Sequence, residues 1–215
     1  MTVSQDNPQA PVALQAIKLE CTRGYRELFS ELSFQLKPGE ILQIDGHNGS
    51  GKTSLLRILC GLSLPNEGEV RWCGLDTRQH RQEYYADMQY VGHINGIKGD
   101  LTPRENLQMA QCLSVASHEI SLDDALEQLG IGGYIDMPSR TMSAGQQRRV
   151  ALARLLTTRA RLWILDEPFT SLDKQARGMV ESMLEQHAAR DGMTVITTHQ
   201  RLQGENYKLN TVNLD

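Results

Sequence analysis

The chain has 215 residues, 40% of them hydrophobic and 22% charged, so it can bury a sizeable core and has the composition of a water-soluble globular protein. Its formal net charge of −4 disfavours a protein that coats nucleic acid, because such proteins are usually basic. No apolar run approaches the length of a membrane span and residues 1–11 lack a signal-peptide pattern, so we expect a cytoplasmic protein with a flexible tail at residues 1–11.

The first third of the chain predicts short strands around a glycine-rich loop. Residues 12–20 alternate apolar and polar side chains, as a half-buried strand does, and residues 32–36 form a second strand-like run. A third run, residues 41–45, leads directly into the loop, and residues 52–60 follow as a helix with several leucines. With a further strand at residues 69–72, this part predicts a small antiparallel sheet laid against the loop and its helix.

The middle of the chain predicts helices, and the last third predicts strands alternating with helices. Thr102 caps a helix that has proline at its first position and glutamate at its third, and Ser121 and Ser143 begin two more. The later pattern is strand, helix, strand, at residues 162–166, 174–189 and 193–198. Such alternation predicts a mostly parallel sheet with helices on both faces.

The glycine-rich loop fits the phosphate-binding pattern G-x-x-x-x-G-K-[ST], with a predicted strand before it and a helix after it. Its glycines let backbone N–H groups turn inward around phosphates, and the helix N-terminus adds positive potential. We expect Lys52 to reach the β- and γ-phosphates and the Thr53 hydroxyl to bind Mg²⁺. The predicted nucleotide-binding residues are Gly46, His47, Asn48, Gly49, Ser50, Gly51, Lys52, Thr53 and Ser54.

Two carboxylates follow the buried strand predicted at residues 162–166. Asp166 stands at its carboxyl end, where an acid can hold Mg²⁺ directly or through water. Glu167 comes next and can polarise an attacking water molecule. We therefore expect Asp166 as a metal ligand and Glu167 as a catalytic residue.

A third motif lies between these two. Met142-Ser143-Ala144-Gly145-Gln146 differs mildly from Leu-Ser-Gly-Gly-Gln, the signature of the ATP-binding cassette (ABC) nucleotide-binding domains, and the order of the three motifs makes the chain resemble that family along nearly its whole length. The resemblance implies a P-loop NTPase α/β fold of ABC type, with a mostly parallel sheet, a small N-terminal antiparallel β subdomain and an inserted helical subdomain at about residues 94–158. Residues 12–215 would form one domain.

The resemblance also assigns chemistry. ATP and Mg²⁺ are the implied cofactors, and Ser143, Ala144, Gly145 and Gln146 would cover the γ-phosphate bound by a second copy of the chain. Ser171-Leu172-Asp173 matches the segment that crosses the interface of that dimer. His199, at the end of a predicted strand, matches the histidine that contacts the γ-phosphate, and Lys52 and Glu167 complete the expected catalytic set.

Two positions depart from the family pattern. The loop after the strand that ends near Val91 normally carries a glutamine close to Mg²⁺, and here His93 stands at that position, as a nucleotide or metal ligand. The aromatic residue expected to stack on adenine is out of register. Arg23 occupies its position, Tyr25 follows two residues later, and either side chain could stack on a base.

The segment Tyr90–Lys98 and the residues 101–107 behind it resemble one subfamily, the ATP-binding subunit of the haem exporter complex of bacterial cytochrome c maturation. Membership implies integral membrane permease subunits as partners and a peripheral place on the cytoplasmic face of the inner membrane. Transported substrate and permease identity are properties of those subunits. We expect no haem site on this chain.

Other interpretations remain open at this point. The chain could serve a different ABC exporter, or act as an ATP-gated scaffold without turnover, although the scaffold would not need Glu167. An ABC ATPase acting on nucleic acid would carry a long coiled coil between Thr53 and Ser143, and the gap is too short for one. A small-molecule kinase would have no use for residues 143–146. The four cysteines, which lack metal-ligand spacing, are expected to be reduced core thiols.

Overall fold

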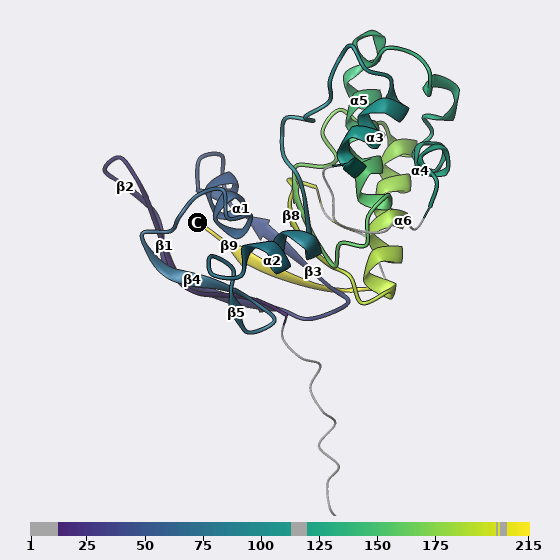
Figure 1. Ribbon diagram of the computed structural model, residues 1–215. Helices are drawn as coiled ribbons and strands as arrows, with labels where there is room; N and C mark the ends of the chain where they lie inside the picture. Colours follow the sequence, from purple (N-terminus) through teal and green to yellow (C-terminus); the bar gives the residue numbers. More distant parts are fainter. Residues whose placement is uncertain (1–12, 113–119, 201, 203–205) are drawn as a thin grey trace, which may run out of the picture.

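The computed structural model describes residues 13–112, 120–200, 202 and 206–215, so the tail predicted at residues 1–11 lies outside the described part of the chain. Two sheets contain the described strands (Figure 1). The first is antiparallel, in the order β2-β1-β4-β5, and is the small N-terminal sheet that the sequence predicts. Its strands are β1 (Leu14–Arg23), β2 (Arg26–Leu36), β4 (Glu67–Trp72) and β5 (Leu75–Asp76).

The second sheet is five-stranded, in the order β6-β7-β8-β3-β9, and every pair in it is parallel. Its central strands β7 and β8 are buried at every residue, as continuous apolar runs in parallel sheets usually are. The strands are β6 (Met88–Val91), β7 (Leu162–Asp166), β8 (Met193–Thr197), β3 (Glu40–Asp45) and β9 (Lys208–Asn213).

Helices cover both faces of the parallel sheet. Successive side chains of a strand point to opposite faces, and β7 divides its side chains in this way. Leu162 and Ile164 join a core with α1 and the antiparallel sheet, while Trp163 and Leu165 join a core with α5 and α6. The helices are α1 (Lys52–Leu59), α2 (Arg81–Asp87), α3 (Pro103–Cys112), α4 (Leu122–Gln128), α5 (Ala144–Leu156) and α6 (Lys174–Ala189).

Helices α3, α4 and α5 contact one another and form a separate group beside the sheets (Figure 1). These helices fall within the span 94–158 that the sequence analysis proposes as a helical subdomain, of which residues 113–119 lie outside the described part. Within the described ranges, every helix is too short or too polar to traverse a lipid bilayer.

The structure contains elements that the sequence analysis did not predict. The edge strand β9 has polar residues at four of its six positions and little burial, so it lacks the apolar alternation of a strand. Helix α2 is rich in charged and polar residues and buries only Tyr84. Strand β5 has two residues, too few for a periodic pattern. All three depend on neighbouring strands and helices, and their own sequences carry little periodicity.

The expectation that all four cysteines are core thiols is wrong for two of them. Cys21 and Cys60 are buried, whereas Cys73 and Cys112 are exposed, and all four are free. Cys73 occupies the turn between β4 and β5 with a positive φ of 50°, which places it outside the packed core. Burial raises the pKa of the Cys60 thiol far above its ordinary value, so this thiol stays protonated and packs as a small apolar group.

Candidate active site

A cleft of about 560 Å³ lies where the parallel strands end at their carboxyl edge. The phosphate loop, the two carboxylates after β7 and His199, which are distant in the sequence, meet here. The residues that line the cleft are Arg23, Leu28, Asn48, Gly49, Gly51, Lys52, Thr53, Ser54, His93, Asp166, Glu167, Thr170 and His199.

The loop between β3 and α1 forms one wall of the cleft. Gly51 precedes the first residue of α1 with φ = 112°, a backbone conformation that side chains other than glycine rarely adopt. A Cβ at Gly51 would also press against Leu28 and Phe29 of β2. The Lys52 ammonium donates hydrogen bonds to the carbonyl oxygens of Gly46 (2.5 Å) and His47 (3.1 Å), so it lies across the loop in which we expect phosphates.

Asp166 joins the two halves of the cleft. Its carboxylate is 4% exposed and accepts hydrogen bonds from the hydroxyls of Thr53 (3.2 Å) and Thr197 (2.7 Å). Thr53 lies in the first turn of α1 and Thr197 ends β8, so Asp166 connects the loop to the centre of the parallel sheet. Hydroxyl and carboxylate oxygens side by side are the hard ligands that Mg²⁺ prefers, and this pair therefore fits the metal expected there.

Glu167 is held in an uncommon backbone conformation. Its φ is +49°, in the left-handed region, and its N–H donates to both the carbonyl oxygen (3.1 Å) and the hydroxyl (3.0 Å) of Thr197. Its buried Oε1 atom lies 3.5 Å from Nε2 of His199, which is longer than an ordinary hydrogen bond, and it has no hydrogen-bond partner among the described residues. A buried carboxylate oxygen with an unused acceptor therefore borders the cleft beside a histidine.

The signature residues lie elsewhere. Ser143 caps α5 in a capping box, in which its side chain accepts from the N–H of Gln146 while the Gln146 side chain accepts from the N–H of Ser143. A Cβ at Gly145 would collide with the carbonyl oxygen of Ser171, so glycine allows this helix to approach the segment after Glu167. None of residues 143–146 is among the described residues that line the cleft.

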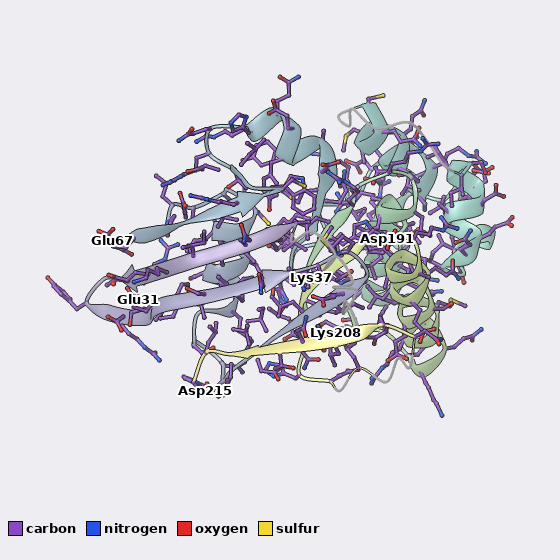
Figure 2. All side chains as sticks on the ribbon, turned by 90° about the horizontal axis from the view of Figure 1, so that it is seen from below. Glu31, Lys37, Glu67, Asp191, Lys208 and Asp215 are labelled. Atoms are coloured by element: carbon purple, nitrogen blue, oxygen red, sulfur yellow. The ribbon has the colours of Figure 1, made fainter. Side chains whose placement is uncertain are left out.

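The phosphate-loop residue His47 contacts the end of β9. Its backbone N–H and its ring Nδ1 both lie within hydrogen-bond distance of Oδ1 of Asp215, at 2.9 and 2.6 Å. Figure 2 shows Asp215 at one end of β9 and Lys208 at the other. The backbone hydrogen bond from His47 is the main reason that the pKa of the Asp215 carboxyl is lowered. The sequence analysis missed this contact because it depends on the neighbouring positions of β3 and β9 in the sheet.

Three positions left open by the sequence are placed as follows. His93 is exposed and lines the cleft, as Glu167 and His199 do. Arg23 also lines the cleft, whereas the Tyr25 side chain is fully exposed at the turn between β1 and β2 and is not among the lining residues. The geometry favours Arg23 over Tyr25 as the side chain that could stack on a base.

Arg148 is a site residue that the sequence analysis missed. It lies in the second turn of α5 and is only 3% exposed, and its guanidinium reaches backbone oxygens on both sides of the cleft. A sequence signal for it exists. Ala151, Leu152 and Leu155 lie three, four and seven residues further along the same buried helix face, where an arginine is out of place unless it has internal acceptors.

The chain is similar to known proteins in sequence. The family model described as ABC transporter matches residues 29–170. The chain is 53% identical over 192 residues, 88% of its own length and 89% of the relative's, to "Cytochrome c biogenesis ATP-binding export protein CcmA" of Nitrosomonas europaea. A protein of the same name from Methylococcus capsulatus is 51% identical over 185 residues, covering 86% of this chain and 89% of that one.

Solved structures match at the level of the fold. An ATP-binding subunit of an ABC transporter superposes with a TM-score of 0.80 at 20% identity, covering 94% of this chain and 86% of that chain. A dimeric ATP-binding cassette in a post-hydrolysis state with ADP and Pi superposes with a TM-score of 0.76 at 22% identity, covering 87% and 88%. The predicted fold class is therefore confirmed.

Proposed function

The chain belongs to the ABC transporter family, and we propose that it is the ATP-hydrolysing motor subunit of a transporter complex that serves cytochrome c biogenesis and haem export. One observation supports the hydrolytic role above all others. A phosphate loop, two carboxylates and a histidine from three separate segments of the chain line a single cleft. The identity of 53% to a cytochrome c biogenesis export protein supports the biological assignment.

The residues of the cleft divide the work of binding. Lys52 and the N–H groups of residues 46–54 would hold the phosphates, because a nest of backbone donors at a helix N-terminus favours anions. Thr53 and Asp166 would hold Mg²⁺, with His93 near enough to the cleft to contribute a ligand or a water contact. When bound, Mg²⁺ neutralises charge on the phosphates.

The hydrolysis step would use Glu167 and His199. Water attacks the γ-phosphorus in line, the bond from that phosphorus to the β-bridging oxygen breaks, and Glu167 accepts the proton of the attacking water. Glu167 suits this role, because its side chain lines the cleft and its Oε1 atom has no hydrogen-bond partner among the described residues. Lys52 and His199 would stabilise the charge that develops on the transferred group.

The proposed partners are integral membrane permease subunits and a second copy of the chain or a like ATP-binding subunit. The signature residues 143–146 do not line the cleft of their own chain. They lie at the N-terminus of α5, and a helix N-terminus is suited to bind an anion. They would cover the nucleotide bound by the second copy. Contact with the permease would place the chain on the cytoplasmic face of the bacterial inner membrane.

Two substitutions test the hydrolytic role. Lys52→Ala removes the ammonium that lies across the phosphate loop and should abolish both nucleotide binding and turnover. Glu167→Gln removes the proton acceptor and should keep ATP binding while lowering the rate of phosphate release by at least about a hundredfold, in line with the contribution of general bases. Phosphate release and equilibrium binding of a fluorescent ATP analogue would be measured on the purified chain and on the complex recovered from membranes.

The control is Gly178→Ala, in the middle of α6, where an added Cβ meets no atom within 4 Å. It should bind and hydrolyse ATP as the unmodified chain does. Full turnover by the Glu167→Gln protein would contradict the hydrolytic role, and a chain that binds ATP without turnover in the membrane complex would favour the ATP-gated scaffold. The identity of the permease co-purified with the chain would separate the cytochrome c assignment from another ABC exporter.

A further inference from the structure

The guanidinium of Arg148 uses all five of its N–H donors inside the protein. Nη2 donates to the carbonyl oxygens of Asp166 (2.7 Å) and Glu167 (3.0 Å), and Nε donates to that of Pro168 (3.3 Å). Nη1 donates to the carbonyl oxygen of Gly92 (2.7 Å) and to Oδ1 of Asn95 (3.0 Å). An arginine has five such donors, so no donor is left for another partner.

The acceptors belong to two segments that border the cleft from different strands. Residues 166–168 end β7 and lead away from it, and they include both carboxylates of the site. Gly92 and Asn95 follow β6 and flank His93, which lines the cleft as well. At the end of a strand, backbone carbonyl groups no longer pair with N–H groups of a neighbouring strand. Arg148 donates hydrogen bonds to four such carbonyl oxygens. One side chain on α5 thus fixes the spacing of both segments.

Glu167 needs such a restraint. Its left-handed φ of +49° is unfavourable for a residue with a side chain, and such conformations persist only where the surrounding structure imposes them. Thr197 holds the N–H of Glu167, and Arg148 together with the N–H of Thr170 (3.2 Å) holds its carbonyl oxygen, so hydrogen bonds fix the backbone on both sides of its Cα atom. The direction of the carboxylate into the cleft depends on this backbone conformation.

Arginine is suited to this position and lysine is not. The five acceptors are neutral oxygens spread around a plane, which matches the planar fork of a guanidinium, whereas an ammonium has three donors around a point. Burial lowers the pKa of Arg148, and the nearby Asp166 carboxylate opposes this effect. A lysine would keep the positive charge but could supply at most three of these five hydrogen bonds.

We propose that Arg148 is a positioning residue for hydrolysis, which fixes the backbone of Glu167 relative to the loop that carries His93. The proposal rests on the proposed catalytic role of Glu167. Lys52 and the N–H groups of the phosphate loop make no use of Arg148, so ATP binds without it. Loss of Arg148 therefore lowers kcat and leaves KM for ATP nearly unchanged, as expected when an interaction matters only in the transition state.

The first test compares Arg148→Lys with Arg149→Lys. Arg149 is the next residue of α5, and its guanidinium donates to the carbonyl oxygens of Leu129 and Gly130 in the helical group, away from the cleft. Arg148→Lys lowers kcat for ATP hydrolysis at least tenfold with KM changed less than twofold, and Arg149→Lys changes neither parameter. Steady-state kinetics of the full chain and thermal unfolding of each variant give the two readouts.

A second variant keeps the proposal testable if Arg148→Lys does not fold. Asn95→Ala removes one acceptor and leaves the guanidinium in place, and it lowers kcat two- to fivefold at unchanged KM. In the double variant Arg148→Lys/Asn95→Ala, the fold-loss of kcat is smaller than the product of the two single fold-losses, because both substitutions remove the same contact. Unchanged kcat in folded Arg148→Lys, or unchanged kcat in Asn95→Ala when Arg148→Lys does not fold, overturns the proposal.

The proposed function is judged separately from this test. If the unmodified chain hydrolyses ATP and Glu167→Gln does not, the hydrolytic role stands whatever the Arg148 variants do. If Glu167→Gln retains full turnover, the hydrolytic role fails and takes the positioning role of Arg148 with it. A loss that appears in KM instead of kcat for Arg148→Lys assigns Arg148 to nucleotide binding and overturns the positioning role alone.

Discussion

At the scale of single residues, His187 of α6 is a half-buried group that the nucleotide cleft does not use. Its ring stacks on Trp163 with 3.6 Å between ring centroids and 3° between planes, and its Nε2 lies 3.3 Å from the carbonyl oxygen of Met193. Burial is the main cause that lowers its pKa to about 4, although hydrogen bonds to backbone groups of Met193 and Arg161 act in the opposite direction. The folded protein therefore holds this imidazole neutral.

This pKa predicts a pH dependence of stability. The unfolded chain takes up a proton on His187 near pH 6.5 and the folded protein only near pH 4, so folding releases a proton between these values. The contribution of neutral His187 to the free energy of unfolding is fully present above pH 6.5 and is lost as the pH falls toward 4. The loss amounts to about 2 kcal/mol between pH 7 and pH 5. Urea unfolding at the two pH values would measure it. In His187→Phe, which keeps a ring on Trp163, the difference between the two pH values should shrink by that amount, and an unchanged difference would contradict the assignment.

At the scale of elements, the connection between α6 and β8 depends on close packing of the last helical turn. The N–H of Gly192 donates to the carbonyl oxygen of His187 at 2.9 Å, and the Gly192 carbonyl accepts from the N–H of Gly39 at 3.2 Å, so the turn joins α6 to the start of β3. A Cβ at Gly192 would overlap the His187 ring, which is already pressed against Trp163. A side chain at position 192 would therefore strain the turn that leads back into the parallel sheet.

Two glycine substitutions around α6 should have opposite effects. Gly192→Ala forces the His187 ring from its stack and should lower the free energy of unfolding by about 1–3 kcal/mol. Gly178→Ala, inside α6 with open space around its Cα atom, should raise it by about 0.5–1 kcal/mol because alanine favours the helix. Urea unfolding of both variants gives the comparison. If the Gly192→Ala protein is as stable as the unmodified chain, the turn tolerates a side chain at this position.

The element scale also shows where the sequence pattern predicts structure well. The predicted helix 174–189 is confirmed at both ends, because Asp173 caps its first turn and the helix carries its own apolar face. Strand β7 is confirmed at 162–166 for the corresponding reason, a continuous apolar run. Strand β9 could not be predicted, since its pairing with β3 supplies the hydrogen bonds while its side chains are mostly exposed.

At the scale of the whole molecule, the cleft and the signature lie in different parts of the structure. The phosphate loop leads into α1 between the sheets, whereas the signature begins α5 in the helical group (Figure 1). Their separation motivates the two-copy arrangement proposed above, in which each nucleotide contacts the phosphate loop of one copy and the signature of the other.

This arrangement predicts that ATP drives dimer formation when hydrolysis is blocked. Glu167→Gln with ATP and Mg²⁺ should shift from the mass of one chain to that of two, as measured by light scattering after size-exclusion chromatography. Adding Ser143→Arg places a bulky cation at the N-terminus of α5, disturbs the capping box and should keep the double variant monomeric. A Glu167→Gln protein that binds ATP and stays monomeric at every concentration tested would rule out the arrangement for the isolated chain.

The sequence by itself determined the features that depend on neighbouring residues. These include the phosphate loop between its strand and helix, the carboxylates at the end of an apolar run, and the serine caps of α4 and α5, because backbone conformation and capping are local. Only the tertiary structure decided which of these features meet. The contact between Thr53 and Asp166 spans 113 residues of sequence, and that between His47 and Asp215 spans 168. The five acceptors of Arg148 likewise come from segments that strand order brings together. Such contacts follow from which strands are adjacent in the sheet, and a periodic pattern in one segment carries no information about its neighbours in space.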